Sequence, residues 1–76
     1  MTIKYDSVND SAYIYIKPEI LAGEVKHTYC CEVNKVGGMI SLDFDRDWRL
    51  LGIEILDASG KLPKEIIETL RHTKYI

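Results

Sequence analysis

Apolar and polar side chains alternate along two neighbouring stretches of this chain, residues 39–44 and 49–56. A period of two residues is that of a β-strand, because successive side chains along a strand point to opposite faces of the sheet. A strand with one apolar face is typical of an antiparallel sheet that is covered on one side. The pattern predicts two strands joined by a turn at residues 45–48. The residues expected on the covered face are Ile40, Leu42, Phe44, Leu51, Ile53 and Ile55.

Three further stretches, residues 2–5, 12–17 and 24–33, have the composition of strands. The short polar side chains of Asp6, Ser7, Asn9 and Asp10 favour a turn between the first two, because such side chains hydrogen-bond to nearby backbone. This predicts a β-hairpin. Pro18 has no amide proton and is expected to end the second strand. Gly37 and Gly38 indicate a turn before the fourth strand, since glycine readily adopts a positive φ.

One helix is expected after the strands. Pro63 suits the first turn of a helix, where its missing amide proton is not needed, and Ile66, Ile67 and Leu70 follow at helical spacing. A helix of about ten residues is not stable alone and has to pack on the sheet. The sequence therefore predicts an α+β fold, with a meander-like antiparallel sheet of about five strands and one C-terminal helix packed on one face. With 76 residues, we expect a single domain over residues 1–76.

Charge and hydropathy argue against two classes of partner. The net charge is −2 and the ten Lys and Arg residues are scattered, whereas nucleic-acid binding requires a basic stripe. The longest apolar run is far shorter than the roughly 20 residues that a membrane span needs. The first ten residues have no hydrophobic stretch of the kind found in a signal peptide. We therefore expect a cytoplasmic protein that binds neither nucleic acid nor membrane.

The two cysteines, Cys30 and Cys31, are adjacent, so on a strand their side chains point to opposite faces. Two cysteines are too few for a disulfide framework, and a bond between neighbours would be strained. Without a second cysteine pair or a nearby pair of histidines, a zinc site is not expected either. We therefore expect no cofactor.

Acidic residues gather around the fourth and fifth predicted strands, and they allow two interpretations. Asp43, Asp45, Glu54 and Asp57 could hold a hard cation, which prefers oxygen ligands, or could serve as general acid and base. Alternating acids also occur on any solvated strand face, and an Asp in a turn bonds local backbone. We favour the second interpretation, with a metal-dependent or carboxylate-based enzyme as the alternative.

The face of the sheet opposite the helix is the stronger functional candidate. Large apolar and aromatic side chains alternate outward from the strands, and such side chains are enriched at protein interfaces. A single helix covers one face, so the other meets water or a partner. The chain is therefore predicted to be a protein-binding or self-associating module, most simply a homodimer. The candidate interface residues are Tyr13, Tyr15, Met39, Trp48 and Leu50.

Three segments together resemble a known family: YDSVNDSAYIYI, SLDFD and RLLGIEILDAS. They are similar to the small prokaryotic proteins catalogued as domain of unknown function 2283. The resemblance implies a compact α+β domain and no enzymatic activity. Two features depart from the family pattern: Trp48 stands where a small turn residue such as glycine is usual, and the Cys30–Cys31 pair is not typical. The matching positions are Tyr5, Asp6, Asp10, Tyr13, Ile14, Asp43, Asp45, Gly52, Ile53, Glu54, Ile55, Asp57 and Ala58.

Overall fold

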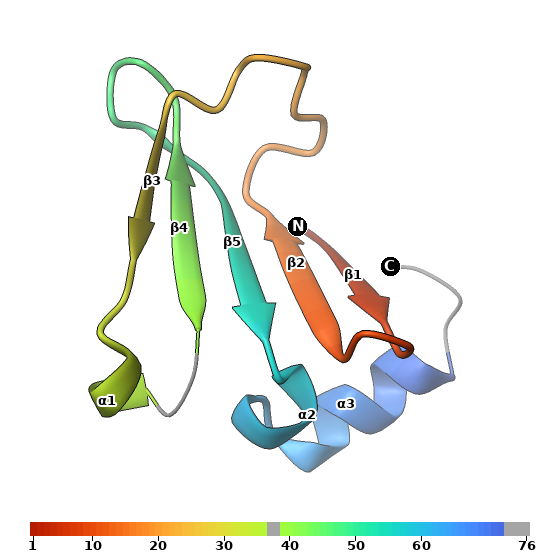
Figure 1. Ribbon diagram of the computed structural model, residues 1–76. Helices are drawn as coiled ribbons and strands as arrows, with labels where there is room; N and C mark the ends of the chain where they lie inside the picture. The colour runs from red at the N-terminus through yellow and green to blue at the C-terminus, as the bar shows by residue number, and fades with distance from the viewer. Residues whose placement is uncertain (37–38, 73–76) are drawn as a thin grey trace.

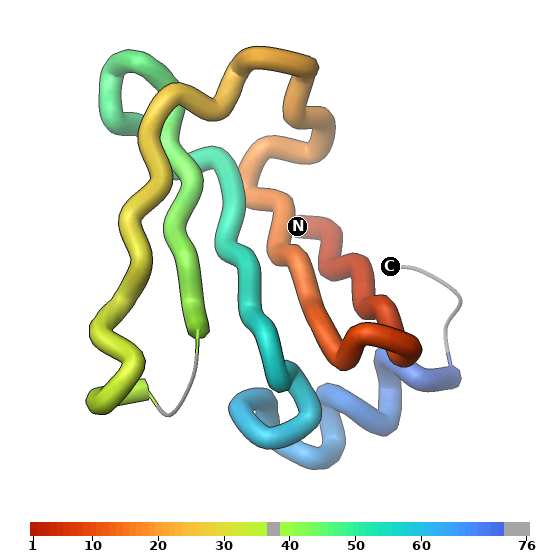
Figure 2. The backbone as a smooth tube through the Cα atoms, in the orientation of Figure 1, coloured from red at the N-terminus to blue at the C-terminus, as the bar shows by residue number. Residues whose placement is uncertain are grey.

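The protein is an antiparallel sheet of five strands with a helical segment at its C-terminal end, as a computed structural model that describes residues 1–36 and 39–72 shows (Figures 1 and 2). The predicted α+β class is confirmed. Within the described residues, no helix is long and apolar enough to cross a membrane. The strands are β1 (Thr2–Asp6), β2 (Ser11–Tyr15), β3 (His27–Cys30), β4 (Ile40–Phe44) and β5 (Leu50–Leu56).

The order of the strands in the sheet is β1-β2-β5-β4-β3, which corrects the meander-like order expected from the sequence. A meander would place β2 beside β3. Instead, Pro18 prevents β2 from continuing, and residues 16–26 carry the chain across the end of the sheet to its far edge (Figure 1). The longest strand, β5, occupies the centre, because its apolar sequence LLGIEIL is suited to a position with a neighbour on each side. The short, exposed β3 lies at the edge.

Strand register brings the predicted apolar faces together. Ala12 pairs with Tyr5 on one side and with Ile55 on the other, and Ile55 also pairs with Ile40. Paired residues share a face, so these side chains form one apolar row across four strands. We call this the helix-side face, because α3 (Lys64–Arg71) packs against it. Among the described residues, Ala12, Ile55, Ala58 and Ile67 form one buried cluster at the centre of the core.

The C-terminal helix forms where the sequence predicts it. Pro63 is its N-cap residue, and Ile67 and Leu70 are the buried residues of α3, whereas Ile66 points away and is 40% exposed. The expected break after β5 is a short helix, α2 (Ala58–Lys61), which carries the chain from the sheet into α3. Ala58 is fully buried there, because α2 turns tightly against β2.

The third strand is the largest departure from the expected boundaries. It was expected over residues 24–33, but β3 covers His27–Cys30, and α1 (Val33–Val36) occupies the end of that range. The predicted turn at Gly37 and Gly38 lies outside the described residues. The apolar residues Val25 and Val33 therefore lie in the flanking segments and not in the sheet.

A β-bulge interrupts the alternation between β4 and β5. Asp43 pairs with Gly52, but the next residue, Phe44, pairs with Leu50, so Leu50 and Leu51 together oppose one residue. Leu50 therefore lies on the helix-side face with Phe44. This corrects its expected position on the face of Tyr13, since strict alternation fails at a bulge.

Candidate functional site

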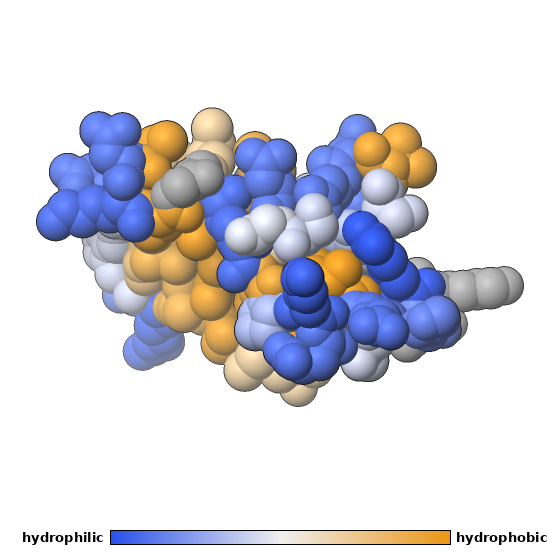
Figure 3. Space-filling view, turned by 90° about the horizontal axis from the view of Figure 1, so that it is seen from below, coloured by the Kyte–Doolittle hydropathy of each residue, from blue (hydrophilic) through white to orange (hydrophobic). Residues whose placement is uncertain are grey.

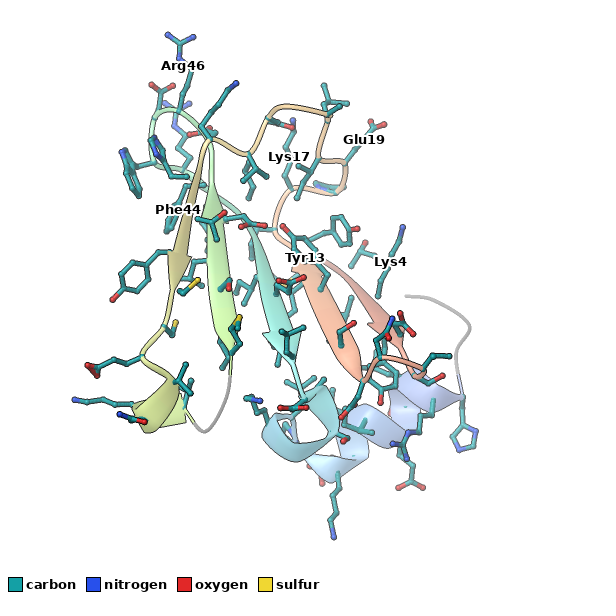
Figure 4. The ribbon with its side chains drawn as sticks, in the orientation of Figure 1. Lys4, Tyr13, Lys17, Glu19, Phe44 and Arg46 are labelled. Carbon is teal, nitrogen blue, oxygen red and sulfur yellow. The ribbon has the colours of Figure 1, made fainter. Side chains whose placement is uncertain are left out.

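Asp43 is the centre of a hydrogen-bond network on the polar face, the face opposite the helix. Its Oδ2 accepts a bond from the Tyr13 hydroxyl at 2.6 Å, and its Oδ1 accepts one from the Thr28 hydroxyl at 2.8 Å. Tyr13 lies on β2 and reaches across β5 to β4 (Figure 4). Both oxygens of the carboxylate are thus occupied by donors of the chain itself. These two hydrogen bonds link β2 and β3 to β4.

Gly52 makes this reach possible, because it is the residue of β5 that lies under the Tyr13 ring. A Cβ atom at Gly52 would come within 2.6 Å of the ring carbon Cζ, closer than real contacts allow. Burial, followed by the hydrogen bond to Asp43, raises the pKa of the Tyr13 hydroxyl well above its usual range. Tyr13 therefore stays protonated and acts as a donor. We call the hydrogen-bonded pair of Tyr13 and Asp43 the clasp. Because its hydroxyl keeps its proton, Tyr13 is unsuited to act as a base.

Asp45 bonds local backbone, as the structural interpretation of the acidic stretch predicts. Its Oδ1 accepts hydrogen bonds from the backbone N–H groups of Arg49 at 3.0 Å and Asp47 at 2.8 Å. The bond from Arg49 is the main reason that the pKa of the Asp45 carboxyl lies below its usual value. Arg46 extends from the same turn into solvent (Figure 4). Asp45 therefore fixes the β4–β5 turn.

The other two acidic candidates are exposed and distant from that turn. Glu54 lies on the polar face, paired with Tyr13 and Ser41. Asp57 follows β5 in a left-handed conformation (φ 55°), and its carboxylate is 3.8 Å from the Lys61 ammonium. The seven residues of β5 span roughly 20 Å, so Asp45 and Asp57 lie at opposite ends of the strand. Within residues 1–36 and 39–72, no group of three or more potential metal ligands comes together.

We expect added metal to leave the protein unchanged, since the carboxylates do not converge. Calcium, magnesium or manganese at millimolar concentration should produce no shift in melting temperature. Calorimetry should detect no binding at micromolar concentration. The double variant Asp43→Asn, Glu54→Gln is the control: binding by the wild type that this variant loses would restore the enzyme alternative.

Asp10 holds the N-terminal hairpin to α2, a role that alternation does not reveal. Its Oδ1 accepts bonds from the Tyr5 hydroxyl at 2.7 Å and the Ser59 N–H at 3.0 Å, and its Oδ2 accepts one from the Ser59 hydroxyl at 2.6 Å. Its backbone carbonyl accepts the Ala58 N–H. The bond from Ser59, then that from Tyr5, lowers the pKa of the Asp10 carboxyl. In the sequence, this cluster was indicated only by the family resemblance, whose matching positions include Tyr5, Asp10 and Ala58.

Trp48 stands in an unusual conformation for a large residue. Its φ of 62° is in the left-handed region, where a bulky side chain is disfavoured. Its ring stacks on His27, with centroids 3.9 Å apart and planes at 5°, and is tilted against Phe44 at 5.3 Å. Even so, Trp48 is 59% exposed. The conformation presents one side of the indole to solvent while the other is held in place.

The helix-side face remains uncovered over β3 and β4. Tyr29 is 58% exposed and pairs with Leu42, and Leu42, Ile40 and Phe44 are half-buried. Viewed from below, apolar surface is visible in the half of the molecule that carries α1, β3 and β4 (Figure 3). We call this surface, with Trp48 at its rim, the open face. It comprises Tyr29, Leu42, Phe44 and Trp48, whereas Ile40 packs against the core.

The five predicted interface residues are divided between the two sides of the sheet. Tyr13 and Tyr15 lie on the polar face, half-buried and in edge contact at 4.8 Å between ring centroids. Met39 is 44% exposed beside β4. Trp48 and Leu50 belong to the other side. Their contact with a partner stays a prediction, but no single flat surface contains all five.

One pocket, of about 360 Å³, has none of the predicted site residues in its lining. Its lining mixes apolar and charged side chains from α2 and α3: Ser59, Lys64, Ile67, Glu68 and Arg71. Cys30 and Cys31 are both free thiols, and the sulfur of Cys30 lies 3.6 Å from the Ser41 hydroxyl.

Comparison with known proteins gives one match. The family model described as protein of unknown function (DUF2283) matches residues 2–59, which include the Asp10 cluster, the Tyr13–Asp43 clasp and the β4–β5 turn. No curated protein and no solved structure matches the chain.

Proposed function

We propose that this chain, which belongs to the DUF2283 family, is a protein-binding module whose contact surface is the open face. The observation that carries the proposal is the exposed apolar surface over β3 and β4, on the same side of the sheet as the core. Exposed apolar side chains that adjoin one another mark interaction sites more often than isolated ones do. The two free cysteines suit a reducing compartment, so we place the module in the cytoplasm.

The width of the sheet indicates what kind of partner fits. Neighbouring strands lie about 4.8 Å apart, so five strands span roughly 20 Å, whereas a helix with its side chains is only about 10–12 Å across. One helix therefore covers about two strands. The helices of this chain make their main strand contacts with β1 and β2. The uncovered width matches one more helix, and we propose that the occupant is an amphipathic helix of a partner protein.

Trp48 is the best residue with which to test the proposal, because it can be removed without strain. Glycine accepts the left-handed conformation that Trp48 adopts, so Trp48→Gly should keep the turn while deleting the most exposed ring of the open face. We expect this variant to stay folded and to lose its partner. The matched control is Tyr15→Lys, which alters an aromatic residue on the polar face.

The measurement is affinity capture from an extract of the source cells with the wild type and both variants. A protein retained by the wild type and Tyr15→Lys, but lost by Trp48→Gly, supports the open face. On mixing with that protein, the fluorescence of Trp48, the single tryptophan, should shift to shorter wavelength as the ring is buried. The reverse pattern, with loss only in Tyr15→Lys, would transfer the interface to the polar face.

A further inference from the structure

The outer edge of β3 is a second surface without a neighbour. β3 is the last strand of the sheet, and among the described segments no element lies outside it (Figure 1). The Cys31 N–H donates to the Ile40 carbonyl at 2.8 Å, so the backbone of Cys31 faces β4. Backbone groups alternate along an antiparallel ladder, and those of Thr28 and Cys30 therefore face outward. Both residues are exposed.

This edge lacks the protection that edge strands usually have. Charged residues within an edge strand prevent pairing with other chains, and the opposite edge strand, β1, carries Lys4 near its middle. The four residues of β3, HTYC, include no Lys, Arg, Asp or Glu. The nearest charges flank the strand symmetrically: Lys26 is three residues before Tyr29 and Glu32 is three residues after it.

We infer that a second copy of this chain pairs with β3, edge to edge and antiparallel, about a two-fold axis at Tyr29. In this register Thr28 of one copy lies opposite Cys30 of the other. The outward-facing backbone N–H and C=O groups of these two residues then hydrogen-bond to each other. Lys26 and Glu32 lie just beyond the two ends of β3, so the antiparallel arrangement brings the Lys26 end of each copy to the Glu32 end of the other, and symmetry places these opposite charges together twice. Neither side chain has an ion-pair partner within residues 1–36 and 39–72, so both are available.

Neighbouring registers fit less well. An axis at Thr28 or at Cys30 would shift one copy by two residues along the other. Such a shift moves Lys26 of one copy away from Glu32 of the other, so the opposite charges beyond the ends of β3 no longer meet. This inference goes beyond the proposed function, because it concerns the sheet edge: of the open-face residues only Tyr29 lies at the contact between the copies, and Leu42, Phe44 and Trp48 of each copy stay free.

Single-cysteine variants test the register directly. Each variant has one cysteine, at position 28, 29 or 30. The first two carry Thr28→Cys or Tyr29→Cys together with Cys30→Ser and Cys31→Ser. The third carries Cys31→Ser alone and so keeps Cys30. At Tyr29 the two Cα atoms across the axis would be about 4.5 Å apart, within the range that a disulfide spans. At Thr28 or Cys30 the same residues of the two copies would be diagonal neighbours, about 7–8 Å apart. We expect oxidised glutathione to cross-link the Tyr29→Cys variant at least ten-fold faster than the other two.

Charge reversal gives an independent measurement on the chain with its native cysteines under reducing conditions. Light scattering coupled to size exclusion should show a mass near twice 8.7 kDa at high protein concentration. Lys26→Glu should weaken dimerisation by about ten-fold or more, and adding Glu32→Lys should restore it. Trp48→Gly should leave dimerisation unchanged, which separates this inference from the proposed function. A mass near 8.7 kDa at every concentration, equal cross-linking rates, or dimerisation that is lost with Trp48→Gly would each overturn it.

Discussion

Replacing Ile55 with alanine should lower the free energy of unfolding by about 2–5 kcal/mol, the usual cost of removing a large side chain from a packed core. Ile55 is 5% exposed and lies in the central strand, between Ala12 and Ile40 in register and against Ile67 of α3. A domain of this size rarely gains more than about 3–5 kcal/mol from its core. The variant should therefore be largely unfolded at room temperature.

Ile66→Ala is the matched control, because it makes the same chemical change on the outward side of α3. Ile66 is 40% exposed, and we expect its replacement to cost less than about 1 kcal/mol. Urea unfolding followed by circular dichroism measures both. Similar losses in the two variants would mean that α3 does not pack against the sheet through Ile67 and Leu70.

Much of the sheet could be predicted from periodicity, because a period of two residues directly reports which side chains share a face. Ile40, Ile53 and Ile55 were expected on the covered side, and all three belong to the core or pack against it. Glu54 was expected on the other side and is exposed. The helix was also predictable from periodicity, because the spacing of Ile67 and Leu70 places them on one face of a helix.

Strand order could not be predicted in this way, because alternation is a local property and carries no information on which strands are neighbours. The pairing of β2 with β5 depends on contacts between residues about 40 positions apart, such as Tyr13 with Glu54. The bulge at Asp43 and Phe44 was hidden for a similar reason. The bulge adds one residue to β5, so Leu50 lies on the helix-side face. The sequence around Leu50 gives no sign of this additional residue.

The acidic stretch shows the same limit for site prediction. Alternation could place Asp43 and Glu54 on one face, but it could not show that Asp43 is already occupied by Tyr13 and Thr28. The open face was not anticipated because the helix was expected to cover one whole side of the sheet. A helix covers only about two strands, and this geometric limit leaves β3 and β4 exposed.

The clasp between Tyr13 and Asp43 leads to the second large expected effect, at Gly52. Gly52→Ala should lower the free energy of unfolding by about 1–3 kcal/mol, the cost of inserting a methyl group into a filled space. The ring cannot move aside without cost, because its hydroxyl is bonded to Asp43 at 2.6 Å and the ring is in edge contact with that of Tyr15. Gly60→Ala is the control: no atom lies within 4 Å of a Cβ there, and we expect no loss of stability.

A double-mutant cycle separates this steric effect from any intrinsic preference of the strand for glycine. In a Tyr13→Ala background the ring is absent, so adding Gly52→Ala should cost less than about 0.5 kcal/mol. The difference between the two backgrounds measures the contact itself. Urea unfolding of the four proteins provides the four free energies. If Gly52→Ala costs the same with and without the ring, the need for glycine lies in the backbone of β5, and Tyr13 reaches Asp43 without depending on Gly52.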